Sequence, residues 1–210
     1  VEETNIDLGG PADQFEIYPF HSKFNPQGDR LIVTLRWIAN TGEPRVDTIG
    51  AKDIRFAVFT IKPDGADLHL AIGPDQWIKG GHHINFFPDG KRLSANLRID
   101  GKALWLVQCN YDGSDLRTMR DDLLGSGHPT VHIDGRHLLT DTYTKESTAF
   151  GDGTIPLRWI DLKTGSVRNL VRINTAQPCQ IGALRIDPHP AWDATWRFVT
   201  FNAFENGTRR

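Results

Sequence analysis

The chain contains the segment His83-Ile-Asn-Phe-Phe-Pro-Asp-Gly-Lys-Arg-Leu93, and variants of this segment recur three more times. The segments from His21 to Leu31 and from His128 to Leu138 align with it without a gap, and that from His189 to Val199 is a more divergent copy. In the first three copies a glycine-containing turn precedes a run of alternating apolar residues, which is the pattern of a β-hairpin. The segment therefore predicts an antiparallel hairpin that recurs along the chain.

A second hairpin pattern lies between successive copies. Apolar strands begin at Phe56, Leu104 and Leu157, and each runs into an Asp-Gly or Thr-Gly turn before a short returning strand. Two hairpins per repeat make a four-stranded unit, and such units in series are typical of the blades of a β-propeller. An open antiparallel sandwich is the alternative, but it gives no reason for a repeated four-stranded unit.

The repeats predict an all-β chain, residues 1–210 forming one partial β-propeller domain of about three and a half four-stranded antiparallel blades. We expect blades at approximately 20–75, 82–122, 127–173 and 188–210, the last of them incomplete. A partial propeller leaves sheet edges exposed and its channel unclosed. We therefore expect these blades to belong to a longer chain of about six to eight blades, a seven- or eight-bladed propeller being the expectation, or a second copy to close the ring.

Composition excludes several classes of protein. The 210 residues are 39% hydrophobic and 24% charged, as in an ordinary folded domain, and the net charge of −2 gives no basic field for a nucleic acid. No run of about 18 apolar residues predicts a membrane span. A first residue Val1 agrees with a processed start, so we expect a periplasmic or extracellular protein. Cys109 and Cys179 leave three alternatives open, namely buried thiols, a disulfide or thiolate metal ligands.

The leading residue of all four copies is histidine. The chain has 8 histidines, and four of them, His21, His83, His128 and His189, occupy this one position. In a propeller the innermost strands surround a central channel, so the four imidazoles are expected to converge at one mouth of it. Converging imidazoles suit Mn, Zn, Fe or Ni. We expect a divalent metal (Mn, Zn or Ca) and no organic cofactor; the alternatives are histidines that cap backbone groups or act without a metal.

A second set of side chains is expected beside these histidines, because a hairpin returns the end of its second strand next to the start of its first. Counting fifteen residues from each leading histidine gives Arg36, Arg98, Tyr143 and Phe204, and two residues earlier lie Thr34, Asn96, Asp141 and Asn202. The two arginines, with Arg185, favour a carboxylate or sulfate ligand. Trp37 and Tyr143 offer rings for a sugar face, although solvated arginines and core aromatics remain the alternatives.

The sequence also resembles a known family. Its leading histidines and the segment from Gly127 to Asp141 resemble those of the β-propeller polysaccharide lyases. The first candidates are the oligogalacturonate lyases, and the second are the propeller ulvan lyases. The segment Asp187-Pro-His-Pro-Ala-Trp192 resembles the His-x-His metal segment of the oligogalacturonate lyases. Two departures are Asp187 where that family has histidine, and a different spacing of Gln180 from His189. The Pro-Asp-Gly hairpins are shared with TolB-like propellers.

The resemblance implies β-elimination on a glycan that contains uronic acid: the carboxylate is neutralised, a base takes the C5 proton, and the bond to O4 breaks. The catalytic candidates are His83, His128 and Tyr143 as acid and base, with Arg36 and Arg98 as neutralising groups. The metal candidates are His189, Asp187 and His21, the last of which fits either set. The candidates for substrate binding are Asn96, Asp141, Trp37 and Arg185. The expected partner is an anionic oligo- or polysaccharide.

Two other functions are open. A noncatalytic TolB-like propeller would bind a protein or peptide through the same mouth, with structural histidines. A glycosidase needs two carboxylates flanking the bond, and the repeat positions offer only Asp141 and Asp187. The glycosidase therefore ranks below both.

Overall fold

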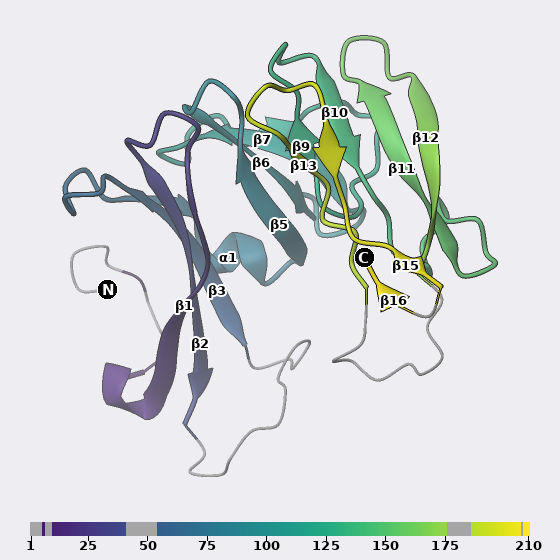
Figure 1. The fold of residues 1–210 in the computed structure, drawn as a ribbon. Coiled ribbons are helices and arrows are strands. Elements are labelled where there is room, and N and C mark those ends of the chain that lie inside the picture. The colour runs from purple at the N-terminus through teal and green to yellow at the C-terminus, as the bar shows by residue number, and fades with distance from the viewer. Residues whose placement is uncertain (1–5, 7–9, 41–53, 176–185, 207) are drawn as a thin grey trace.

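The computed structural model describes residues 6, 10–40, 54–175, 186–206 and 208–210. They include three consecutive four-stranded antiparallel sheets, and each sheet is a simple meander in which neighbouring strands follow one another in sequence. Figure 1 shows the sheets as a fan, with the N-terminal sheet at one side and β11 and β12 at the other. The all-β architecture of four-stranded blades is thereby confirmed.

The strands fall where the hairpin pattern puts them. The first sheet contains β1 (Phe15–Phe24), β2 (Leu31–Ala39), β3 (Arg55–Ile61) and β4 (His69–Ile72). The second contains β5 (Gly81–Phe86), β6 (Arg92–Leu97), β7 (Trp105–Asn110) and β8 (Arg117–Thr118). The third contains β9 (Thr130–Val131), β10 (His137–Thr140), β11 (Thr154–Asp161) and β12 (Val167–Asn174).

The fourth copy forms two short ribbons. They pair β13 (Ala191–Trp192) with β14 (Val199–Thr200), and β15 (Phe204–Glu205) with β16 (Thr208–Arg209). Helix is confined in the described ranges to one turn, α1 (Pro74–Trp77), and a 3-10 turn (Ala12–Gln14). Neither of these turns is long and apolar enough to cross a membrane.

The blades pack face to face through apolar clusters. Ile32 and Val58 of the first sheet meet Ile84 and Leu97 of the second in one buried cluster. Burying each such side chain contributes roughly 1.5–3 kcal/mol. Similar clusters join the second sheet to the third, and the third to the hairpin of β13 and β14. Each blade is therefore held by its neighbours, and the starts of the inner strands come together.

Candidate functional site

The leading histidines lie where the inner strands change register. β1 has an irregularity between Phe20 and Lys23, and β5 has one between His82 and Asn85. At these points His21 and His83 adopt φ values of 51° and 55°, and His189 adopts 46°. A positive φ is uncommon for a side chain other than glycine, and β-bulges re-aim side chains next to functional sites. The bulges turn these imidazoles toward the channel.

In the third copy the histidine is directed toward the cluster by a different backbone conformation. There the positive φ of 58° falls on Gly127, one residue before His128. A Cβ at Gly127 would lie 2.3 Å from the carbonyl oxygen of Asp141, so only glycine fits. The backbone therefore passes close to Asp141, which then hydrogen-bonds to His128.

The four imidazoles converge, as the sequence predicted. Ring centroids lie 3.7 Å apart for His128 and His189 and 3.9 Å apart for His83 and His128. His21 lies further out, with its ring centroid 6.3 Å from that of His83 and stacked on Phe20. Four side chains from four different repeats therefore form one cluster.

The cluster borders a cavity of about 550 Å³. Its polar lining includes His21, His82, His83, His189, Arg36, Tyr143 and Asp187, and its apolar lining includes Phe20, Phe56 and Trp77. A second cavity of about 460 Å³ shares His21, His83 and His189 with the first and continues to Lys23 and Asn85. The two cavities thus meet at the histidines.

Burial favours the neutral form of the His82 and His83 imidazoles. It lowers the pKa of His82 to about 4, and together with His128 and His82 it holds the pKa of His83 far below its usual value. Burial also lowers the pKa of His21 and of His189. Neutral imidazoles have a free lone pair, so near pH 7 they can accept a proton or bind a metal.

Asp141 orients His128. Its carboxylate accepts a hydrogen bond from the backbone N–H of His128 at 2.6 Å and lies 2.9 Å and 3.0 Å from Nδ1 of the same residue. With the Nδ1 proton held by Asp141, Nε2 carries the lone pair, and this buried atom has no hydrogen-bond partner among the described residues.

His128, Asp187 and His189 meet the requirement for metal ligands. One ligand atom from each lies within 4.8 Å of the others. The buried Nε2 of His128, left without a partner, fits this reading, because a metal would satisfy it. His21, expected as a ligand, is outside this group, and His128, expected as an acid or base, is inside it.

Tyr143 reaches the cluster on a loop. Strand β10 ends at Thr140, and Glu146 holds the following turn by accepting hydrogen bonds from Thr142 Oγ1 at 2.7 Å and from the Tyr143 N–H at 3.3 Å. The Tyr143 hydroxyl lies 2.6 Å from Nε2 of His83. Tyr143 is therefore paired with an imidazole from another blade.

Arg36 forms the opposite wall of the cavity. It is 6% exposed, and its guanidinium carbon lies 4.6 Å from the Phe20 ring centroid and 5.0 Å from that of Phe56. Its buried Nε has no hydrogen-bond partner among the described residues. Aromatic faces thus hold a cation that lines the cavity.

Three predicted site residues lie elsewhere. Trp37 is completely buried in the core beside Ala57, because it follows Arg36 and so points to the other face of β2. Asn96 is also 0% exposed, and its amide donates to the carbonyl of Gly127 at 2.9 Å. The structure corrects both assignments to substrate binding.

Arg98 lies just beyond the end of β6, is exposed, and donates to the carbonyl of Lys102 instead of lining the cavity. The assignment of Arg98 as a neutralising group is therefore also corrected. Arg185, Gln180 and Cys179 lie outside the described residues. Cys109 is buried, and burial raises the pKa of its thiol to about 12.

Three residues at the cavities, His82, Trp77 and Lys23, were not predicted from the sequence. His82 directly precedes a leading histidine, and this pairing of histidines was the available signal. Trp77 comes from α1, which follows the first blade and has no counterpart in the repeat pattern. Lys23 lies two residues after His21, lines the second cavity with it, and donates to the carbonyl of Ile84 at 2.9 Å.

Comparison with known proteins supports the fold. No protein-family model and no curated protein sequence matches the chain. Among solved structures, an oligogalacturonate lyase in complex with manganese is 15% identical with a TM-score of 0.56, covering 97% of this chain and 68% of that one. An oligogalacturonate lyase from Vibrio parahaemolyticus is 13% identical with a TM-score of 0.52, covering 97% and 69%.

TolB from Acinetobacter baumannii is similar to the same degree. It is 11% identical with a TM-score of 0.54, covering 93% of this chain and 54% of that one. The chain thus spans about half to two thirds of the length of these structures. At such identities the likeness shows the fold alone, and this fold is that of a β-propeller.

Proposed function

We propose that this chain is part of a polysaccharide lyase that cleaves a uronate-containing glycan by β-elimination in the histidine-lined cavity. The supporting observation is that one cavity of about 550 Å³ brings together Arg36, the Tyr143–His83 pair and the group of His189 and Asp187. These are the three elements that the reaction needs: a counter-charge for a carboxylate, a group that exchanges a proton, and a site for additional positive charge.

Arg36 binds the uronate carboxylate. Its planar guanidinium matches a carboxylate, and its position between the rings of Phe20 and Phe56 restricts its motion. Charge that develops on the carboxylate as C5 loses its proton is stabilised by this fixed cation. Trp77 and Phe56 offer apolar faces for the sugar ring in the same cavity.

His128, Asp187 and His189 would hold a divalent metal. Two imidazoles and a carboxylate suit Mn or Zn better than Ca, which prefers oxygen ligands. When bound, the metal would supply further positive charge to the substrate carboxylate. Asp141 keeps His128 in the tautomer that this role requires.

Tyr143 and His83 move the proton. The Tyr143 oxygen takes the C5 proton while its own proton passes to Nε2 of His83, 2.6 Å away. The electron pair of the C5–H bond forms the C4–C5 double bond and expels O4. Tyr143 then protonates O4 and recovers its proton from His83, so neither residue is consumed.

The alternative is a noncatalytic propeller that binds a protein or peptide at the same mouth. The likeness to TolB favours this alternative as much as the likeness to the oligogalacturonate lyases favours elimination. For either function we propose a periplasmic or extracellular location. Further blades or a second copy would close the ring.

The test is the ultraviolet absorbance of the conjugated double bond that elimination creates. The protein is incubated with oligogalacturonate, pectate and ulvan, each with and without added Mn or Zn. We expect absorbance to rise on at least one uronate and not on a neutral glycan. The absence of a rise on every uronate would refute the lyase, and retained peptide binding by His128→Ala would then favour the alternative.

A further inference from the structure

Trp196 occupies a backbone position that glycine fills in the other three repeats. The equivalent residues Gly28, Gly90 and Gly135 have φ values of 75°, 66° and 66°, and Trp196 has 58°. For a bulky L-residue this left-handed conformation is unfavourable. The backbone of the fourth turn is therefore strained at the residue that carries the indole ring. Strain of this kind is a reason to look for a function of the ring.

The ring joins an aromatic cluster between the third and fourth repeats. We call it the tryptophan patch, and it consists of His132, His137, Trp159, Trp192 and Trp196. The ring centroid of Trp196 lies 6.2 Å from that of His132 and 6.3 Å from that of Trp192. Trp159 stacks on His137 at 4.8 Å. All five side chains are half-buried, so each also contacts solvent.

The turn position that Trp196 occupies is open in two of the other three repeats. At Gly28 and Gly135, where the structure does contain the next blade, a Cβ would find no described atom within 4 Å. The equivalent position thus faces open space at Gly28 and Gly135, whereas at Gly90 a Cβ would meet Gln27 and Asn25 of the first blade. Trp196 carries its indole into the corresponding space.

The indole leans back toward the preceding blade. A Cβ at Gly90 would meet Asn25 of the blade before it. In the third repeat the equivalent of Asn25 is His132, and the Trp196 ring lies edge-on to this residue. The position of Trp196 therefore follows from the repeat itself.

Polar groups border the rings. The Asp134 carboxylate lies 2.7 Å from Nδ1 of His137 and 3.0 Å from Nδ1 of His132. Half-exposed indoles beside a fixed carboxylate and two imidazoles offer flat apolar faces together with hydrogen-bonding groups. This combination matches a pyranose ring, which has an apolar C–H face and a hydroxylated edge.

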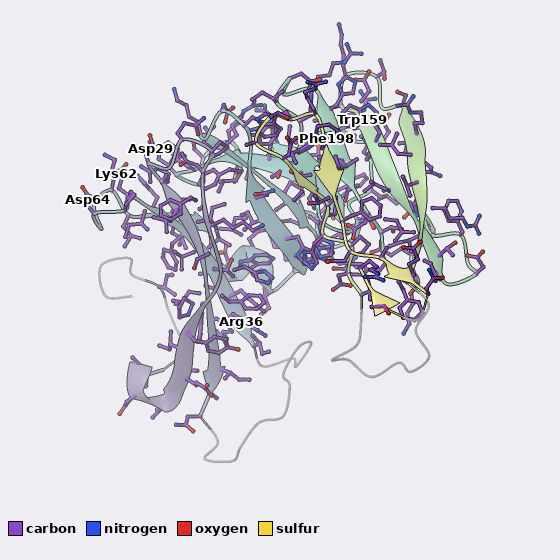
Figure 2. All side chains as sticks on the ribbon, viewed as in Figure 1. Asp29, Arg36, Lys62, Asp64, Trp159 and Phe198 are labelled. Atoms are coloured by element: carbon purple, nitrogen blue, oxygen red, sulfur yellow. The ribbon has the colours of Figure 1, made fainter. Side chains whose placement is uncertain are left out.

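We propose that the tryptophan patch is a second glycan-binding site. It lies at the opposite end of the inner strands from the histidine cluster, and Figure 2 shows Trp159 and Phe198 well apart from Arg36. The proposal extends the proposed function, because another part of the same glycan would bind on a second face. Sugar binding at the patch does not, however, require elimination in the histidine-lined cavity.

The test replaces Trp196 by glycine, the residue of the other repeats. Binding of an oligogalacturonate hexasaccharide and of cellohexaose is measured by calorimetry and by tryptophan fluorescence. We expect Trp196→Gly to weaken binding of at least one of them about tenfold or more, while Tm stays the same or rises because strain is relieved. Phe150→Ala, which removes an exposed aromatic ring outside the patch, should leave binding unchanged.

Two kinds of result would overturn the proposal. One is that the parent chain binds neither sugar, or that Trp196→Gly binds both as tightly as the parent. The other is that Tm falls by several degrees with no change in binding, which would make Trp196 a packing residue. The elimination assay on the same variants separates the two ideas: lost binding without elimination supports the patch alone, and elimination with unaltered binding supports the lyase alone.

Discussion

The hydroxyl of Tyr143 lies 2.6 Å from Nε2 of His83, and the two residues come from neighbouring blades. The contact joins the loop after β10 to the bulge in β5, so both repeats must be in place before the pair exists. The distance between the two side chains therefore depends on how the second and third blades pack against each other.

Removing only the hydroxyl tests this pair. Tyr143→Phe should lower kcat for elimination by about 10²- to 10⁴-fold, the usual contribution of general acid–base catalysis, with little change in KM. The matched control is Tyr111→Phe, whose ring packs against Arg30 away from the histidines. A Tyr143→Phe enzyme as active as its parent would contradict the proton relay.

Lysine substitutions distinguish the guanidinium group of Arg36 from a positive charge alone. Arg36→Lys keeps the charge but loses the planar guanidinium, so we expect elimination to fall about 10- to 100-fold, the value of a charge-assisted hydrogen bond. Arg98→Lys, which changes an exposed arginine outside the cavity, should leave the rate unchanged. Equal losses in the two variants would argue against carboxylate binding by Arg36.

Asp141 is expected to act on metal affinity through His128. Asp141→Asn removes the acceptor of the Nδ1 proton, so Mn binding measured by calorimetry should weaken about 10- to 100-fold. Asp134→Asn is the control, because Asp134 contacts two surface histidines in the same manner outside this site. Denaturant unfolding of both variants shows whether lost affinity reflects lost folding.

The buried His82 predicts a dependence of stability on pH. Its pKa falls from 6.5 to about 4 on folding, so between these values the unfolded chain binds a proton that the folded chain does not. The free energy of unfolding should therefore decrease as the pH falls through this window, by at most about 1.4 kcal/mol per pH unit for this group.

Urea unfolding at pH 7 and pH 5 measures this slope. His82→Gln should reduce it, because this variant removes a group whose pKa is lowered by folding. An unchanged slope in His82→Gln would mean that His82 is protonated in the folded chain.

The repeat pattern was sufficient to predict four-stranded blades and the convergence of His21, His83, His128 and His189. Both follow from local rules: turn residues end strands, alternation sets their faces, and equivalent positions in equivalent units meet near one axis. The exclusion of Trp37 from the cavity follows from the same alternation, since it neighbours Arg36 on the strand.

Tertiary structure decided which residues surround those histidines. A count of fifteen residues reached Arg36, which lies inside β2 and lines the cavity, but the equivalent Arg98 lies beyond the end of β6 and outside it. Tyr143 arrives on a loop that Glu146 holds, and His128 joins His189 because Asp141 from the next strand orients it. Sequence determines the units and their repeated positions, whereas distances between side chains of different blades depend on bulges, loops and packing that no single repeat contains.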